Sequence, residues 1–421
     1  MGGGLLQLVA YGAQDVYLSG NPQITFFKVA YRRHTNFSME SIEQTFNGNA
    51  DFGRRVTCQI SRNGDLIHRM YLQVNLTGLT TDANALVGLS LIKSVELEIG
   101  GQRIDKQYGD WMYIWNELSL PTGKQAGFKS MVGTPTALTG GNGSATFYVP
   151  LEFWFCRNPG LALPLIALQY HEVKVNIEFS TSTEALITST SPVMGTTALW
   201  VDYVFLDTDE RRRFAQLSHE YLIEQLQFTG EENIGAASNK VKLNFNHPVK
   251  ELVWVMQNAP GTSGTSDEFG EYTDTATGNY TVSAKLQLNG HDRFAERQGK
   301  YFNEVQPFQH HTNVPTNKGI NVYSFALKPE EHQPSGTLNF SRIDSAVLNV
   351  TASTNAKRIR VYAVNYNVLR VMSGMGGLAY SNWVALLNFL QKISIIFISK
   401  NSINFLLKNW IRIYKKNTNG T

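Results

Sequence analysis

A chain of 421 residues is long enough for two domains that each bury a core, and its 42% hydrophobic and 17% charged residues exclude a disordered protein. The net charge of +3 depends on residues 383–421, which hold six basic and no acidic side chains, whereas residues 1–382 hold 31 basic and 34 acidic ones. A slightly acidic body lacks the basic face that releases counterions from phosphates, so we expect no specific nucleic-acid binding.

We expect no export or lipid signal in the N-terminal region. No basic residue precedes Lys28, which excludes the charged region of a secretory signal, and Leu6 stands where a myristoylation motif requires Ser or Thr. Further along, Cys58 alternates with apolar neighbours and is predicted to be a buried thiol in a strand. Cys156 is the only other cysteine, so neither a disulfide framework nor a cysteine metal site is expected, which fits a reducing compartment.

Alternation of apolar and polar residues predicts strands with one buried face in both halves of the chain. Over residues 173–179, Val, Val, Ile and Phe oppose Lys, Asn and Glu. In the second half, Val282, Ala284, Leu286 and Leu288 are predicted to share a buried face. The same pattern predicts half-buried strands over residues 56–60, 72–76, 95–99, 241–245 and 359–363.

The chain also contains an apparent internal duplication. Residues 97–104 (LEIGGQRI) and 286–294 (LQLNGHDRF) each combine a strand, a tight turn with glycine, and an arginine followed by an apolar residue. A second pair aligns Tyr148 with Tyr323. The first copy has more residues between its glycine turn and its tyrosine than the second copy has. This difference predicts a longer loop in the first copy, between Trp111 and Tyr148.

Helices are expected only within connections. Trp111, Ile114, Trp115 and Leu118 follow helical spacing and predict a helix after Asp110. Its counterpart in the second copy is predicted within residues 294–305, just after the second glycine turn. Asn-Gly dipeptides at 47–48, 63–64, 142–143 and 289–290 mark turns between strands, so the whole pattern is typical of β-sandwiches or barrels.

Charge concentrates over residues 207–216, between strands predicted to end near Leu206 and to begin near Tyr221. Three successive arginines, 211–213, lie beside Asp and Glu there. Because the acidic neighbours offset the arginines, a solvated or salt-bridged linker is favoured over a site for polyanions.

No motif for catalysis or for nucleotide binding stands out. The chain lacks a Gly-x-Ser-x-Gly elbow, and its glycine-rich stretches lack the lysine of a P-loop. His171 and Glu172 are adjacent on a predicted strand and point to opposite faces, so His171 is predicted to be a core or edge histidine rather than a metal ligand. His310 and His311 are predicted to be solvated in a polar loop. We expect no catalytic, cofactor-binding or metal-binding residues.

Six N-glycosylation sequons occur within residues 1–382. Asn142 and Asn279 lie in predicted loops and are the candidate glycan sites, whereas the others lie in or near predicted strands: Asn36, Asn75, Asn339 and Asn349. Without a secretory signal, chance occurrence is favoured over glycan attachment.

Five longer motifs follow one another along the chain. They are residues 8–28 (LVAYGAQDVYLSGNPQITFFK), 60–66 (ISRNGDL), 95–105 (VELEIGGQRID), 159–173 (PGLALPLIALQYHEV) and 365–380 (NYNVLRVMSGMGGLAY). In this order they closely resemble the major capsid proteins of large eukaryotic double-stranded DNA viruses, particularly those of the phycodnaviruses and their mimivirus-like relatives. The resemblance covers residues 1 to about 382.

The resemblance implies an all-β fold of two tandem eight-stranded jelly rolls with short helices in the loops. It implies a structural protein of the virion, not an enzyme, that forms homotrimers. Three copies of a two-roll subunit give six similar blocks, so the capsomer is pseudo-hexagonal and tiles an icosahedral shell. The implied partners are further copies of the chain, minor capsid proteins and the inner viral membrane, reached through the N-terminal segment, with assembly in the host cytoplasm.

The expected organisation is an N-terminal segment (1–26) facing the capsid interior, a first jelly roll (27–212), a linker (213–224) and a second jelly roll (225–382). Residues 383–421 depart from the family pattern. Their high content of Ile, Asn and Lys, which have A- and T-rich codons, is typical of translated noncoding sequence. A membrane-facing anchor fits less well, because the apolar stretch 384–398 is interrupted by polar residues and is shorter than a bilayer span.

The runner-up function is that of a carbohydrate-binding β-sandwich, such as a lectin-like viral surface protein, because exposed Trp or Tyr on a jelly roll can stack on sugars. A hydrolase on a β scaffold is disfavoured by the lack of a nucleophile motif. The mass in solution discriminates between the capsid subunit and the lectin. A compact trimer supports the capsid subunit, and a stable monomer with glycan affinity supports the lectin.

Overall fold

The computed structural model divides into two compact units, Met1–Phe37 and Ser38–Thr421. In the first unit, helix α2 (Asp15–Ser19) has no buried residue. The residues that the structure describes are 9–10, 12–21, 34–79, 86–133, 143–182, 185, 192–235, 237–258, 269–274, 278–353, 356 and 358–380. The predictions made for 383–421 lie outside them.

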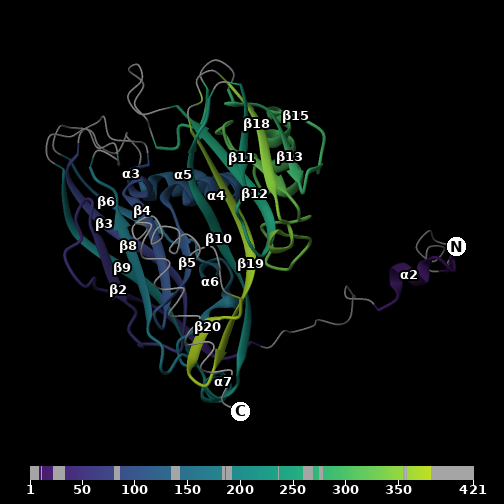
Figure 1. Ribbon diagram of the computed structural model, residues 1–421. Helices are drawn as coiled ribbons and strands as arrows, with labels where there is room; N and C mark the ends of the chain where they lie inside the picture. Colours follow the sequence, from purple (N-terminus) through teal and green to yellow (C-terminus); the bar gives the residue numbers. More distant parts are fainter. Residues whose placement is uncertain are drawn as a thin grey trace, which may run out of the picture. The chain divides into compact units, whose positions relative to one another are not determined.

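The first half of the second unit forms two antiparallel sheets (Figure 1). One has the strand order β1 (Phe37–Gln44), β9 (Val193–Leu206), β3 (Leu66–Leu79), β6 (Gly143–Pro150), with β7 (Leu163–Pro164) also paired to β3. The other has the order β2 (Arg55–Gln59), β8 (Val173–Phe179), β4 (Ile92–Ile99), β5 (Gln102–Gln107). Numbering the main strands from one to eight along the chain gives the sheets 1-8-3-6 and 2-7-4-5, which is the arrangement of a jelly roll.

The second half repeats this arrangement strand by strand. One sheet has the order β10 (His219–Asn233), β19 (Arg358–Met372), β12 (Pro248–Gln257), β16 (Asn321–Ser324), with β17 (Leu338–Asn339) on β12 and β20 (Met375–Leu378) on β19. The other has the order β11 (Ala237–Lys242), β18 (Ala346–Ala352), β13 (Thr281–Leu288), β14 (His291–Asp292), with β15 (Arg297–Gln298) on β13. The predicted double jelly roll is therefore confirmed.

Short helices occupy the connections, as predicted. The helix expected after Asp110 is α4 (Gly109–Ser119), and its counterpart is the π-helix η3 (Tyr301–Val305), which continues as α8 (Gln306–His310). The longer loop expected in the first copy holds α5 (Thr122–Val132). Within the described residues the remaining helices are α3 (Val87–Ser90), α6 (Trp154–Arg157), η2 (Pro159–Leu161), α7 (Thr208–Gln216) and η4 (Phe340–Arg342).

The two glycine turns that suggested a duplication are equivalent hairpins. Gly100 and Gly101 join β4 to β5 with φ values of 57° and 84°, and Asn289 and Gly290 join β13 to β14 with φ values of 49° and 83°. Positive φ at both central residues is the geometry of a type I′ turn, whose twist matches that of the flanking strands. The sequence signal and the structural repeat coincide here.

The second pair of the apparent repeat needs a correction. Tyr148 and Tyr323 do lie on the equivalent strands β6 and β16. Tyr148 is exposed and contacts Tyr71, whereas Tyr323 is buried in the core of the second roll. The two tyrosines thus point to opposite faces, because a shift of one residue along a strand reverses the side of the sheet.

Two strand predictions also differ in detail. Val282 is exposed instead of sharing the buried face of Ala284 and Leu286, because the pairing of β13 with β18 is irregular between Thr281 and Ser283. The strand predicted over 241–245 lies earlier in the chain, as β11, and ends at Lys242.

The connection between the rolls lies earlier in the chain than the expected linker 213–224. The first roll ends with β9 at Leu206, as expected, and α7 follows directly. The range 213–224 expected to be a linker contains the end of α7 and the beginning of β10, which starts at His219. Arg211 on α7 forms an ion pair with Asp65, at 2.9 Å between Nε and Oδ1, in agreement with the salt-bridged interpretation of the arginine run.

Candidate functional site

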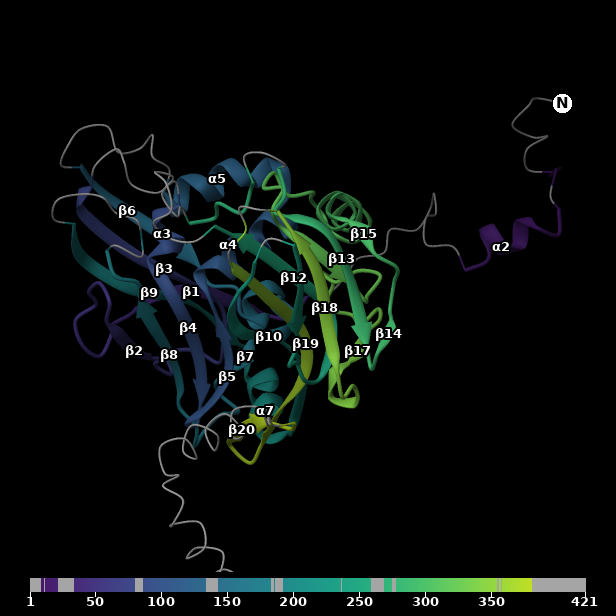
Figure 2. The ribbon, with the colours of Figure 1, turned by 45° about the horizontal axis from the view of Figure 1, so that its top comes forward.

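The two rolls meet along one face of the second roll (Figure 2). Strand β12 contributes side chains to two separate cores: Val253 and Val255 belong to the core shared with the first roll, and Leu252, Trp254 and Met256 to the interior of the second. The sheet formed by β10, β19, β12 and β16 is therefore buried on both faces. We call this contact the junction; the first roll contributes β5, α4 and α6 to it.

Buried charges pair across the junction. Glu224 of β10 lies 2.8 Å from Nζ of Lys250 on β12 and 3.1 Å from Nη1 of Arg157 on α6. The Lys250 side chain is completely buried, and Nζ lies 5.9 Å from the ring centroid of Trp115. Burial by itself would raise the pKa of Glu224, but Lys250, His332 and Arg157 together lower it to about 2. Glu224 is therefore ionised at neutral pH and links Lys250 of the second roll to Arg157 of the first.

Asp105 of β5 makes a second set of contacts to β10. Its carboxylate accepts a bond from the backbone N–H of Leu226 at 3.1 Å and one from Nε2 of Gln107 at 3.1 Å. Burial raises the pKa of Asp105 to about 6, although these donors act against the shift. In the same region Gln225 donates to the backbone carbonyl of Ile104. Polar groups at the edge of β5 thus fix its position against β10.

A third contact links the first turn of α4 to β19. Asp110 pairs with Arg360, whose Nε lies 2.9 Å from Glu231 on β10. The hydroxyl of Tyr272 donates to Asp110 at 3.1 Å. Since Asp110 and Arg360 come from different rolls and are both half-buried, their ion pair fixes the relative position of the rolls more narrowly than apolar packing does.

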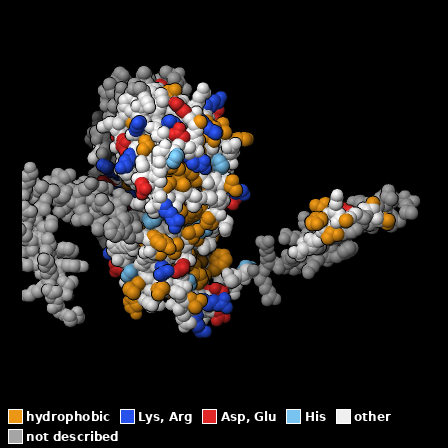
Figure 3. Space-filling view, turned by 45° about the vertical axis from the view of Figure 1, so that its right-hand side comes forward, with side chains coloured by type: hydrophobic (Ala, Val, Ile, Leu, Met, Phe, Trp, Pro, Cys, Tyr) orange, Lys and Arg blue, Asp and Glu red, His pale blue; other side chains and the backbone are white. Residues whose placement is uncertain are grey.

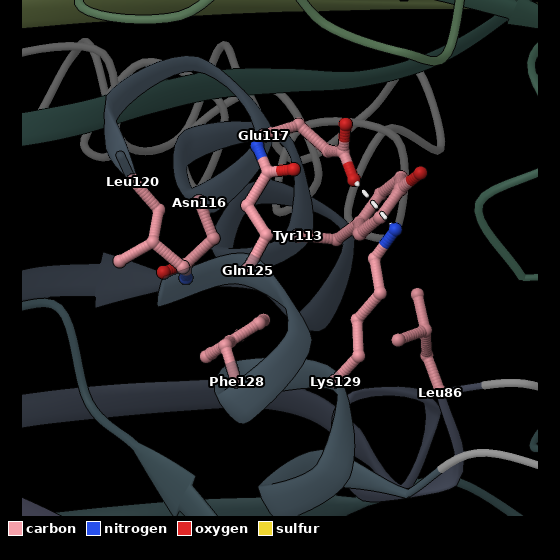
Figure 4. Close-up of a pocket in the computed structure, with 8 residues that line it drawn as sticks. All are labelled: Leu86, Tyr113, Asn116, Glu117, Leu120, Gln125, Phe128 and Lys129. Atoms are coloured by element: carbon pink, nitrogen blue, oxygen red, sulfur yellow. Dashed lines mark ion pairs between the residues drawn. The ribbon is translucent and has the colours of Figure 1, made fainter. Parts of the chain in front are cut away.

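The far end of α4 is held by Glu117. The hydroxyl of Thr316 donates to its carboxylate at 2.9 Å, and Asn313 donates to its backbone carbonyl at 2.9 Å. Lys129 of α5 lies 3.6 Å from the same carboxylate (Figure 4). The hollow beside this pair has room for about one water molecule, so it is packing space and not a ligand pocket.

The structure corrects the prediction for one histidine. His311 is buried, with Nε2 3.0 Å from Glu251 on β12 and Nδ1 2.9 Å from Glu330. Burial alone would lower its pKa, but the two carboxylates raise it to about 9, so the imidazole is protonated at neutral pH. His310 is the half-buried neighbour, and its Nδ1 lies 3.0 Å from the backbone carbonyl of Leu327.

Two apolar surfaces of the second unit have no cover within the described residues. The first, which we call the aromatic face, lies on the outer side of the sheet β1-β9-β3-β6 in the first roll. Tyr71 stacks on Trp200 with ring centroids 6.2 Å apart and planes at 7°, and Tyr148 lies 6.2 Å from Tyr71. Met39 of β1 is 49% exposed on the same side as Ser41, which contacts the Tyr71 hydroxyl.

The second surface, which we call the α8 edge, lies in the second roll. Phe308 of α8 is 79% exposed and Leu327 is 72% exposed, and Val305 at the end of η3 is partly exposed beside them. Figure 3 shows hydrophobic side chains gathered over the middle and lower part of a face that includes the second roll. Exposed apolar side chains in contiguous groups mark interaction surfaces on soluble proteins.

The predicted site residues do not form a site. Asn142 lies outside the described residues. Asn279 is buried, contrary to the expected solvated loop, and its Nδ2 donates to Asn321 at 2.8 Å, so a glycan there would have to displace this bond. His171 is half-buried with Nδ1 2.9 Å from the carbonyl of Gly376, as expected of an edge histidine. Cys58 is a buried free thiol, as predicted.

Within the described ranges, no group of three or more His, Cys, Asp or Glu side chains could hold a metal ion. A helix with the length and apolar character needed to cross a membrane is likewise not found among the described helices.

The sequence did contain a signal for the junction. Residues 248–257 (PVKELVWVMQ) form a nearly continuous apolar run, which is typical of a strand buried on both faces. Lys250 and Glu251 interrupt this run, and both are fully buried with partners. A charged residue inside such a run indicates a buried ion pair, but its partners are distant in sequence and cannot be identified from the run alone.

Two family models together match most of the chain. The model described as major capsid protein N-terminus matches residues 25–207, and the one described as large eukaryotic DNA virus major capsid protein matches residues 210–377. The major capsid protein of Pyramimonas orientalis virus is 62% identical over 415 residues, which cover 91% of this chain and 100% of that protein. That of Paramecium bursaria Chlorella virus 1 is 48% identical over 440 residues, with the same coverage.

Solved structures show the same likeness. A chain of the PBCV-1 virus capsid superposes with a TM-score of 0.75 at 42% identity and covers 85% of this chain and 100% of its own. The Faustovirus major capsid protein superposes with a TM-score of 0.69 at 14% identity, covering 86% of this chain and 94% of its own, which shows a common fold. The chain belongs to the major capsid proteins of large eukaryotic DNA viruses.

Proposed function

We propose that this capsid subunit acts by self-association into homotrimers, and that these are pseudo-hexagonal capsomers of an icosahedral shell. The observation that carries the proposal is the repeated strand order of the two rolls, since three copies then supply six similar blocks. Threefold symmetry alone gives a triangular unit, whereas a duplicated block brings the outline close to sixfold and allows hexagonal tiling.

The junction supports this role physically. A block that must keep its orientation in a shell needs a rigid internal contact, and the junction combines a shared apolar core with buried ion pairs such as Glu224 with Lys250. No step of this function needs catalysis, so we propose a purely structural protein without enzymatic activity or cofactor.

The N-terminal segment is proposed to face the capsid interior and to contact minor capsid proteins and the inner viral membrane. Its helix α2 exposes Val16, Tyr17 and Leu18, which favours contact with an apolar or interfacial partner. The two rolls are proposed as two domains, of which the first ends with β9 at Leu206 and the second begins with β10 at His219. Assembly is proposed to take place in the host cytoplasm.

Light scattering on the purified full chain tests the proposal. We expect a single species with three times the chain mass of 47.1 kDa. A stable monomer or dimer at micromolar concentration would contradict the trimer while leaving the family assignment unchanged.

A further inference from the structure

A loop of the second roll is joined to itself at its base. Residues 327–335 lie between β16 and β17 and contain no helix or strand, and we call them the latch loop. The backbone N–H of Leu327 donates to the carbonyl of Ser335 at 3.3 Å, and that of Lys328 donates to the Ser335 hydroxyl at 3.0 Å. Because its ends are bonded to each other, the middle of the loop can move without a change in the flanking strands.

Two side chains of the latch loop contact two separate clusters of buried charge. Glu330 lies 2.9 Å from Nδ1 of His311, and its carboxylate also accepts bonds from the backbone N–H and the hydroxyl of Thr312. Nδ1 of His332 lies 3.8 Å from Glu224, the carboxylate at the junction. The latch loop therefore connects the cluster around His311 to the contact between the two rolls.

The number of donors that His311 offers depends on its charge. A protonated imidazole presents an N–H at both nitrogen atoms, and here Nε2 lies 3.0 Å from Glu251 while Nδ1 lies 2.9 Å from Glu330. A neutral imidazole keeps one N–H, and its other nitrogen presents a lone pair. After loss of the proton, one of the two carboxylates therefore faces a lone pair instead of a donor.

The contact that is lost is the one with the latch loop. The side chain of Glu251 is completely buried, and neither of its oxygens accepts a hydrogen bond from a described residue other than His311. The Glu330 side chain is 18% exposed and retains its two bonds from Thr312. Because a buried carboxylate without a partner costs more than a partly solvated one, the N–H stays on Nε2, and Nδ1 then repels Glu330.

The ionisable groups near His311 come from the latch loop, β12 and β19. Burial alone would lower the pKa of His311, but the carboxylates of Glu251 and Glu330 raise it to about 9. Lys250, next to Glu251 on β12, belongs to the ion pair at the junction. Tyr366 of β19 is close enough for the charge of Glu251 to act on it, and burial raises its pKa, so it stays neutral where His311 loses its proton.

We propose that the charge of His311 keeps the latch loop closed, and that the loop opens locally in alkaline solution while both rolls remain folded. Opening exposes the charge of Glu330 to water and removes His332 from Glu224. One proton inside the second roll thus acts on a contact at the junction. The arrangement lies within one chain and does not rest on the proposed self-association.

A nitroxide spin label on the latch loop of the full chain tests the proposal. Gln333→Cys introduces an exposed thiol, whereas the native thiols of Cys58 and Cys156 are buried and should not react with the label at neutral pH. We expect the electron paramagnetic resonance spectrum to show a more mobile label at pH 10 than at pH 7. The matched control is the same label at Val282→Cys, an exposed site on β13, whose spectrum should be the same at both pH values.

Glu330→Gln separates the latch from a general effect of alkaline solution. The glutamine amide can accept a bond from the charged imidazole and can donate one to Nδ1 of the neutral imidazole, so the label at residue 333 should be equally mobile at both pH values. Light scattering of the same samples records the oligomeric state separately.

Three results would overturn the proposal. One is a label at residue 333 whose mobility does not change with pH in the otherwise unchanged chain. Another is a change of equal size in the Glu330→Gln background. The third is a label at residue 282 that becomes mobile together with the loop, which would show unfolding of the whole roll instead of local opening.

Discussion

At the scale of single residues, the chain concentrates its buried charge where its two rolls meet. Lys250 has no exposed surface and pairs with Glu224, which also binds Arg157 of the other roll. Removing one member of a buried pair leaves the other charge in a medium that solvates it poorly, so such residues are more sensitive than surface ion pairs.

For Lys250→Met we expect a loss of about 3–5 kcal/mol in the free energy of unfolding, because Glu224 loses its nearest cation. The matched control is Lys285→Met, which removes a surface pair with Asp292 at 3.4 Å and should cost less than about 1 kcal/mol. Denaturant titration of both variants measures the difference. Equal losses would show that the junction does not depend on this pair.

The His311 cluster predicts a specific dependence on pH. Its folded pKa of about 9 exceeds the unfolded value of about 6.5, so its stabilisation is complete below pH 6.5 and is lost as the pH rises through 9. The loss is on the order of 3 kcal/mol. We expect the melting temperature of the wild type to fall between pH 7 and pH 10 more than that of His311→Gln. His310→Gln should follow the wild type, and parallel curves for all three proteins would refute the role of His311.

The sequence pattern predicted the burial of a residue correctly where that burial depends on its neighbours in the same strand. Cys58 was predicted as a buried strand thiol from its immediate neighbours, and this is confirmed. The prediction that His311 is solvated was wrong, because its partners Glu251 and Glu330 come from β12 and from a separate loop. A buried charged residue is predictable only together with partners that the local sequence does not contain.

At the scale of elements, the two equivalent hairpins differ in the residue types that their turns can accept. Gly100 and Asn289 hold the same first turn position at positive φ. A Cβ at Gly100 would overlap the ring of His171, whereas one at Gly101 meets no atom within 4 Å. The first roll therefore requires glycine at a position where the second uses asparagine.

We expect Gly100→Asn to destabilise the protein by about 1–3 kcal/mol, through overlap with His171, since Asn itself tolerates positive φ. Gly101→Asn is the control, because Gly101 also has a positive φ but a Cβ there meets open space; it carries the backbone strain alone and should destabilise the protein less than Gly100→Asn. Thermal melting compares the two. Similar melting temperatures would mean that His171 moves aside without cost.

Alternation predicted the existence of strands better than their faces. Residues 173–179 form β8 with the predicted bounds, because the strand has one buried side throughout. Val282 was assigned to the wrong face, because an irregular register reverses the side of the sheet while the sequence pattern stays intact. The alignment of Tyr148 with Tyr323 failed to show that the two side chains lie on opposite faces, which differ by a shift of one residue.

At the scale of the whole molecule, duplication places two rolls of the same strand order in one chain, and the junction joins them. The family and the double roll were predictable because long motifs and two glycine turns lie in the sequence itself. The junction could not be predicted, because it depends on which sheet of the second roll faces the first roll. The apolar run of β12 indicates burial on both faces, but it does not say that one of these faces packs on the first roll.

Averaged electron cryo-microscopy images of the purified full chain test the central claim most directly. We predict particles with three chains and six similar blocks around a common axis. Particles that hold a single chain, or particles in which two chains meet through the same surface about a twofold axis, would contradict the account.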